Sequence, residues 1–145
     1  MKPLRIGLLG IGTVGGGTFD VLTRNAEEIS RRAGRPITIT HVADKNTALA
    51  NQVVAGRATV TDDAFGVVRN PDIDVVVELI GGYGVAKQLM LEAINNGKHV
   101  VTANKALLAL HGNEIFAAAR AKGVIVAFEA AVAGGIPIIK ALREG

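Results

Sequence analysis

The feature that most constrains this chain is a regular alternation of short apolar runs with stretches of helical periodicity. Apolar runs typical of buried strands cover residues 4–9, 37–43, 74–80, 98–102 and 124–128. Helices are expected over residues 13–33, 85–94 and 113–122, with one short helix in 44–61, another capped by Asp62 or Asp63, and a last one from Pro137. Strands that are apolar on both faces and separated by helices indicate a parallel sheet covered on both sides. Because crossover connections are right-handed, we predict an α/β domain over residues 1–145 with a doubly wound, mostly parallel sheet.

The turn after the first expected strand carries a glycine pattern with a specific physical use. The pattern G-x-G-x-x-G follows a buried strand and opens a helix, which is the context in which it binds dinucleotides. Its residues are Gly10, Ile11, Gly12, Thr13, Val14 and Gly15. The first glycine allows a tight turn, the second lets the backbone approach a pyrophosphate, and the third lets the helix pack closely. The helix N-terminus adds a partial positive charge. The pattern favours a Rossmann-type dinucleotide-binding domain over an unrelated α/β protein with a glycine-rich turn.

The second expected strand ends at Asp44 and Lys45, where such domains read the adenosine ribose. An acidic residue at this place binds the ribose 2′-hydroxyl of NAD, whereas a basic residue attracts the 2′-phosphate of NADP. In this chain the two residue types stand side by side. A loop Asp that starts a turn, followed by a solvated Lys, is a competing interpretation. The residues alone therefore leave the choice between NAD and NADP open.

Two further segments follow strands at the same expected sheet edge. Ile80 and Gly81 begin a loop whose glycines permit close approach of a dinucleotide, although a plain connection is an alternative. Thr102 ends the next strand and Lys105 follows it closely. A Lys at this edge can hydrogen-bond a nicotinamide carboxamide or a substrate oxygen. Judged by position alone, a surface lysine that begins a helix is the better interpretation of Lys105.

The segment after the last expected strand consists of Glu129 and a run of small residues that reaches Pro137. Such a turn can present several backbone carbonyls, and carbonyls with one carboxylate suit a hard cation of low charge. On the residues alone, a simple strand-to-helix turn with a capping Glu is preferred. His41, His99 and His111 lie far apart in the sequence without metal-ligand spacing, so we expect no metal role for them.

Composition narrows the classes of function. The chain has no Cys, which excludes disulfides, cysteine metal sites and a thiol nucleophile, and which fits a cytoplasmic setting. Its net charge of +3 is small, and no basic stripe is interleaved with aromatic residues, so we expect no nucleic-acid partner. The longest uncharged run, residues 6–19, is shorter than the roughly 20 residues that a membrane helix needs, so we expect no membrane association.

Together these segments resemble the N-terminal half of homoserine dehydrogenase. The matching stretches are residues 10–15, 78–82, 97–108 and 128–139. The glycine pattern is shared by many families, whereas Thr102–Lys105 and Glu129–Pro137 together are specific to this one. The resemblance extends over essentially the whole chain. It implies an oxidoreductase that interconverts L-homoserine and L-aspartate 4-semialdehyde with NAD(P), on the pathway to threonine, methionine and isoleucine.

The resemblance also implies roles for individual residues. It places Lys105 at the nicotinamide end of the site, so we expect Lys105 to be a catalytic residue on the nicotinamide and substrate side. Lys45 tilts the expected preference modestly towards NADP. The cofactor-binding residues expected from pattern and resemblance together are Gly10, Ile11, Gly12, Thr13, Val14, Gly15, Asp44, Lys45, Ile80, Gly81, Thr102 and Lys105. A structural sodium ion is expected to take mostly backbone oxygens from Glu129, Val132, Gly134 and Ile136.

In the family, the substrate-binding segment with its acid/base Lys lies downstream of the position matching Gly145. The sheet that makes dimer contacts lies downstream as well. We therefore expect this chain to bind cofactor without turnover, and the full enzyme to be a homo-oligomer. A dehydrogenase of the semialdehyde or glyceraldehyde-phosphate type is disfavoured, because its thioester chemistry needs a Cys. A stand-alone NAD(P)-sensing module remains the alternative from another class.

Overall fold

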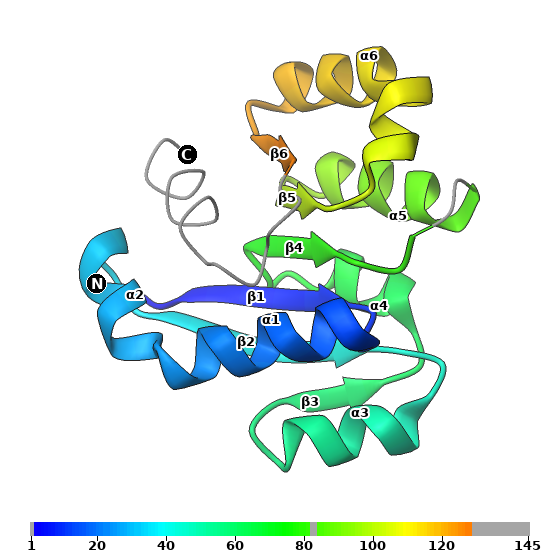
Figure 1. Ribbon diagram of the computed structural model, residues 1–145. Coiled ribbons are helices and arrows are strands. Elements are labelled where there is room, and N and C mark those ends of the chain that lie inside the picture. Colours follow the sequence, from blue (N-terminus) through cyan, green and yellow to red (C-terminus); the bar gives the residue numbers. More distant parts are fainter. Residues whose placement is uncertain (1, 82–83, 129–145) are drawn as a thin grey trace.

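The described residues form one parallel sheet between two layers of helices (Figure 1). The computed structural model describes residues 2–81 and 84–128. The strands are β1 (Leu4–Leu9), β2 (Ile37–Ala43), β3 (Thr59–Thr61), β4 (Val75–Glu78), β5 (His99–Thr102) and β6 (Val126–Phe128). Their order in the sheet is β3-β2-β1-β4-β5-β6, and every pair is parallel. This is the strand order of the Rossmann-type fold, so the predicted fold class is confirmed.

The helices divide between the two faces of the sheet, as double winding requires. They are α1 (Thr13–Arg24), α2 (Ala26–Ala33), α3 (Thr47–Val54), α4 (Ala64–Arg69), α5 (Gly84–Asn95) and α6 (Lys105–Lys122). The first three contribute to one buried apolar cluster and the last three to a second. The two clusters are separated by the sheet, because neighbouring residues of a strand point to opposite faces. Val77 of β4 belongs to the first cluster and Val76 to the second.

The helix predicted over residues 13–33 is two helices. Asn25 ends α1 and begins α2, with φ −104° and ψ 20°. Its backbone N–H donates to the Val21 carbonyl at 3.0 Å, and its side-chain amide donates to the same oxygen at 3.1 Å. An Asn side chain that bonds to nearby backbone competes with helix continuation. The break therefore comes from a local polar contact, which apolar periodicity does not register.

Two other elements differ from the sequence prediction. The segment expected to hold a helix and a loop also contains β3, which is only three residues long and pairs with the end of β2. Helix α6 begins at Lys105 instead of residue 113, because the Asn104 side chain caps it by accepting from the Leu107 N–H at 3.0 Å. The cap predicted at Asp62 or Asp63 is Asp63. Pro137 lies outside the described residues.

Candidate functional site

The three glycines of the turn between β1 and α1 have different surroundings. Gly10 shapes the turn, Gly15 packs against it, and Gly12 borders open space. Gly10 has φ +96°, a conformation that favours glycine. A Cβ on Gly15 would clash with the Gly10 carbonyl oxygen, so the start of α1 can lie this close to the turn only without a side chain. A Cβ on Gly12 would have no atom within 4 Å. Gly10 and Gly15 therefore serve the protein's own packing, whereas the space beside Gly12 is open to a ligand.

The N-terminus of α1 lies beside this open space and, among the described residues, has neither a capping side chain nor an acidic residue in its first turn. Gly12 is the N-cap residue, and within the described residues no side chain caps it. The first turn carries no acidic residue. The first N–H groups of a helix have no partner inside the helix, and their partial positive charge favours anions. Thr13 and Val14 belong to this first turn, which gives the turn the form of a phosphate-binding site.

Asp44 connects the end of β2 to the glycine turn. Its Oδ2 accepts from the Ile11 N–H at 2.7 Å, and its Oδ1 accepts from the Asn46 N–H at 2.8 Å. Both carboxylate oxygens therefore accept from backbone N–H groups. The contact with Asn46 is that of an Asp that starts a turn, the competing interpretation from the sequence, whereas the contact with Ile11 was missed because Ile11 is 33 residues away. The neighbouring Lys45 is exposed at the same end of β2. The two residues expected near the adenosine ribose thus lie beside the glycine turn.

The loop after β4 is held by Glu78, a residue to which sequence reasoning gave no role. Glu78 is fully buried at the end of β4. Its Oε2 accepts from the N–H of Ile80 at 2.7 Å and from the N–H of Gly81 at 3.1 Å. Its Oε1 accepts from the Thr102 hydroxyl at 2.8 Å. The signal that could have identified it is a carboxylate that follows three valines near the end of a strand otherwise apolar after Asp74.

Thr102 and Lys105 have different surroundings at the end of β5. Thr102 is fully buried, and its hydroxyl also accepts from the Asn104 N–H at 3.0 Å, so the side chain is engaged inside the protein. Lys105 is exposed as the first residue of α6. A pocket of about 190 Å³ lies between the loops after β4 and β5, and its lining includes Gly81, Ala103 and Asn104.

The expected cofactor residues therefore gather along one edge of the sheet. The glycine turn, Asp44, Gly81 and Lys105 follow β1, β2, β4 and β5, whose carboxyl ends share that edge. The turn and the β4 loop are in contact, since a Cβ on Gly10 would lie 3.0 Å from the Leu79 carbonyl oxygen. Ligands of open parallel sheets bind at this edge, where the strand order reverses. In this sheet the reversal lies between β1 and β4.

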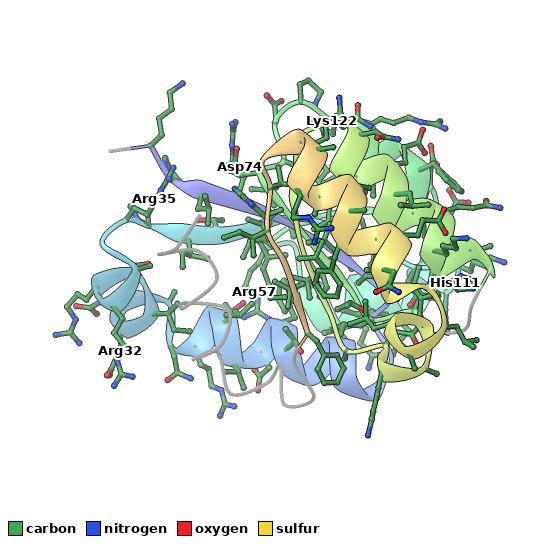
Figure 2. All side chains as sticks on the ribbon, turned by 90° about the horizontal axis from the view of Figure 1, so that it is seen from above. Arg32, Arg35, Arg57, Asp74, His111 and Lys122 are labelled. Carbon is green, nitrogen blue, oxygen red and sulfur yellow. The ribbon has the colours of Figure 1, made fainter. Side chains whose placement is uncertain are left out.

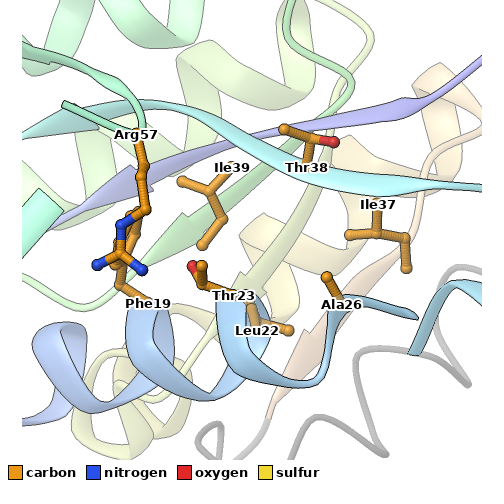
Figure 3. Close-up of a pocket in the computed structure, with 8 residues that line it drawn as sticks. All are labelled: Phe19, Leu22, Thr23, Ala26, Ile37, Thr38, Ile39 and Arg57. Atoms are coloured by element: carbon orange, nitrogen blue, oxygen red, sulfur yellow. The ribbon is translucent and has the colours of Figure 1, made fainter. Parts of the chain in front are cut away.

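A second pocket, of about 140 Å³, lies between α1 and the first residues of β2 (Figure 3). Phe19, Leu22 and Ile39 supply much of its apolar lining, and the Arg57 guanidinium lies over the Phe19 ring at 5.0 Å. Stacking of this kind lets Arg cover an apolar surface. The pocket lies away from the carboxyl ends of the strands, so we assign it to packing.

Lys98 and His99 have lowered pKa values and lie at the opposite edge of the sheet, where they line a pocket with Asp74 and Arg35, two residues that Figure 2 labels. Burial lowers the pKa of Lys98, whose ammonium donates to the carbonyls of Asn70 at 2.6 Å and Ile73 at 2.7 Å. Burial also lowers the pKa of His99, whose Nδ1 accepts from the Ile125 N–H at 3.1 Å. Both residues join neighbouring segments, so their role is structural.

Within residues 2–81 and 84–128, no group of three or more His, Asp or Glu side chains is placed to hold a metal ion. The sodium ligands expected at Glu129, Val132, Gly134 and Ile136 lie outside the described residues. None of the described helices has the length and apolar character that a membrane span requires.

Comparison with known proteins identifies the family. A family model described as "Homoserine dehydrogenase, NAD binding domain" matches residues 10–129. That range contains the glycine turn and the loops after β2, β4 and β5. This chain belongs to the homoserine dehydrogenase family. The resemblance noted from the sequence is thereby confirmed.

Individual members of the homoserine dehydrogenase family show how much of a whole enzyme the chain spans. The homoserine dehydrogenase of Pseudomonas aeruginosa is 66% identical over 145 residues, which are 100% of this chain and 33% of that protein. That of Neisseria gonorrhoeae is 62% identical, with the same two shares. The crystal structure of a homoserine dehydrogenase from Thiobacillus denitrificans is 64% identical with a TM-score of 0.87, covering 100% of this chain and 33% of that one. The chain thus spans about a third of the length of these relatives, and not the half that the sequence resemblance suggested.

Proposed function

We propose that this chain is the NAD(P)-binding part of a homoserine dehydrogenase, an enzyme that interconverts L-homoserine and L-aspartate 4-semialdehyde by hydride transfer. The observation that carries the proposal is the uncapped N-terminus of α1 beside the open space at Gly12. This arrangement lies inside the range that matches the family's NAD-binding domain. The bound cofactor supplies the hydride chemistry, and the residues of this chain bind and orient it.

Each half of the sheet serves one half of the cofactor in this proposal. The pyrophosphate lies at the glycine turn, on the first N–H groups of α1. Asp44 and Lys45 lie towards the adenosine ribose, because they follow β2. Ile80, Gly81 and Lys105 follow β4 and β5 and lie towards the nicotinamide. Thr102 contributes through the backbone that its hydroxyl helps to hold, since that hydroxyl is engaged with Glu78.

The cofactor preference is a finer part of the proposal, and we favour NADP modestly over NAD. The Lys45 ammonium is exposed next to the expected position of the 2′-phosphate. The Asp44 carboxylate would repel that phosphate, but each of its oxygens accepts a backbone N–H, which partly offsets the negative charge. Lys45→Ala should therefore weaken NADPH binding more than NADH binding.

Other parts of the proposal rest on the family resemblance. They are a sodium ion held by Glu129, Val132, Gly134 and Ile136, and a homo-oligomeric full enzyme. A cytoplasmic location and the absence of a nucleic-acid partner rest instead on the lack of Cys and on the small net charge of +3. The sodium site is tested by thermal melting of the chain in sodium chloride and in choline chloride at equal ionic strength. A bound sodium ion should give the higher melting temperature in sodium chloride.

Calorimetric titration of the chain with NADPH and with NADH tests the central proposal. We expect both cofactors to bind, NADPH more tightly, and we expect Lys45→Ala to reduce the difference. Failure of both cofactors to bind would overturn the dinucleotide assignment. Adding L-homoserine and NADP⁺ to the chain tests the expectation of binding without turnover. A steady, homoserine-dependent rise in NADPH absorbance would contradict that expectation.

A further inference from the structure

Glu78 is the only Asp or Glu that is fully buried in the described part of the chain. Within that part, no Lys, Arg or His forms an ion pair with its carboxylate. Its compensation comes from the Ile80 and Gly81 N–H groups and the Thr102 hydroxyl. A charge is costly to bury unless such donors surround it. Strand residues buried on both faces are normally apolar, so this carboxylate needs a reason to be here.

The three donors come from the loop after β4 and from Thr102, the last residue of β5, at the carboxyl edge. Glu78 and Thr102 are direct partners in the pairing of β4 with β5, so the carboxylate spans the two strand ends. On the β4 side it fixes Gly81, whose φ of +83° is a conformation that few other residues adopt. The N–H groups of Ile80 and Gly81 turn inward towards the carboxylate. The Glu78 carboxylate therefore holds the backbone of this loop from the buried side.

On the β5 side the same carboxylate acts through Thr102. The Thr102 hydroxyl donates to Glu78 and accepts from the Asn104 N–H, which lies at the start of α6. Asn104 in turn caps α6 by accepting from the Leu107 N–H. The first residue of that helix is Lys105. One buried carboxylate thus connects the β4 loop, the β5 loop and the N-terminus of α6 around the pocket of about 190 Å³.

We infer that Glu78 is a positioning residue for the nicotinamide half of the cofactor. The inference rests on the proposed function, since it requires NAD(P) to bind along this edge. Strands β4 to β6 form the second mononucleotide-binding half of the fold, so the nicotinamide lies over the loops that Glu78 holds. Glu78 is fully buried and also belongs to the lining of the pocket between these loops, and it acts on the nicotinamide through the loop backbone that its carboxylate holds. Loops fixed in advance bind more tightly, because less ordering accompanies binding.

The test compares two ligands that differ only in the nicotinamide. NADPH and 2′-phospho-ADP-ribose are titrated into the parent chain and into Glu78→Ala. We expect the variant to lose about tenfold in affinity for NADPH while its affinity for 2′-phospho-ADP-ribose stays within about twofold. Glu78→Gln should recover most of the loss, because its carbonyl oxygen can accept from Ile80 and Gly81 while its amide donates to Thr102. Glu92→Ala, which removes an ion pair with Arg69 on the surface, is the matched control and should change neither affinity.

The outcomes separate a positioning role from a general structural one. Equal losses for both ligands in folded Glu78→Ala, or no loss for NADPH, would overturn the inference. If Glu78→Ala does not fold, Thr102→Val replaces it, because this variant removes the hydroxyl and keeps the shape. A selective loss of NADPH affinity in Thr102→Val supports the inference, and an unselective loss or none overturns it. If the parent chain binds neither ligand, the proposed function fails first and the inference with it.

Discussion

The Asp44 carboxylate accepts a hydrogen bond of 2.7 Å from the Ile11 backbone N–H, across 33 residues of sequence. A second link lies beside it, where the Gly10 N–H donates to the Ala43 carbonyl at 2.8 Å. The end of β2 therefore fixes the glycine turn that follows β1 before any phosphate arrives. A turn fixed in this way loses little conformational freedom when a ligand binds.

Replacing Asp44 tests whether this hydrogen bond stabilises the fold. Ile11 is buried, so in Asp44→Ala its N–H has no water to replace the lost carboxylate. We therefore expect a loss of about 1–3 kcal/mol in the free energy of unfolding. Asp44→Asn keeps an acceptor oxygen and should lose less. Urea unfolding followed by circular dichroism measures both. Equal losses in the two variants would show that the charge of Asp44 matters more than its hydrogen bond to Ile11.

Substitution of Gly12 separates ligand space from packing space. A Cβ on Gly12 and a Cβ on Gly17 would each have no atom within 4 Å, so Gly12→Ala and Gly17→Ala should both fold. Gly17 is inside α1, where Ala is favoured over Gly by about 0.5–1 kcal/mol, so Gly17→Ala should be slightly more stable than the parent chain. In Gly12→Ala the methyl group occupies the space proposed for the pyrophosphate, so we expect NADPH affinity to fall by about tenfold or more. Unchanged NADPH affinity in Gly12→Ala, measured by calorimetry, would move the pyrophosphate away from this turn.

The sequence predicted the parts of the fold that depend on local patterns. The apolar runs located β1 and β4, the Asp63 cap began α4, and the glycine spacing located the turn that α1 follows. It missed β3, because three residues carry too little periodicity and the strand exists through its pairing with β2. The late predicted start of α6 has a related cause, since Gly112 lies inside that helix and interrupts its apolar pattern.

For the candidate site, too, the sequence predicted what depends on local patterns and missed what depends on long-range contacts. Pattern and resemblance selected residues that the structure places along one edge of the sheet, because glycines and charged residues at strand ends stand out in a sequence. They could not identify what holds those residues. The partner of Asp44 is 33 residues away, and the hydroxyl that donates to Glu78 is 24 residues away. Such contacts follow from the strand order, which places β2 beside β1 and β5 beside β4.

Lys98 supplies a prediction about stability at the other edge. Its ammonium donates to the carbonyls of Asn70 and Ile73, and the side chain is almost fully buried. Lys98→Met keeps the apolar stem but leaves both carbonyls without this donor, so we expect a loss of about 2–3 kcal/mol in the free energy of unfolding. The control is Lys87→Met, which removes a surface ion pair with Glu114 and should cost less than about 1 kcal/mol. Equal urea midpoints for the two variants would contradict the structural role of Lys98.

His99 makes the stability of the fold depend on pH. Its Nδ1 accepts from the Ile125 N–H and so must be unprotonated, and burial lowers the pKa of His99 more than the nearby Asp74 raises it. The folded state therefore binds fewer protons than the unfolded chain, whose His pKa is about 6.5. The contribution of His99 is complete above that value and is lost as pH falls from about 6.5 through the folded pKa.

The measurement is the free energy of unfolding of the parent chain and of His99→Asn across this pH range. Asn keeps an acceptor for the Ile125 N–H but does not titrate, so the stability advantage of the parent chain over this variant should shrink as pH falls below about 6.5. Gln52→Asn, a change at an exposed position of α3 without a titratable group, serves as the control and should retain the pH dependence of the parent chain. A constant difference between the parent chain and His99→Asn over the whole range would show that His99 titrates alike in the folded and unfolded states.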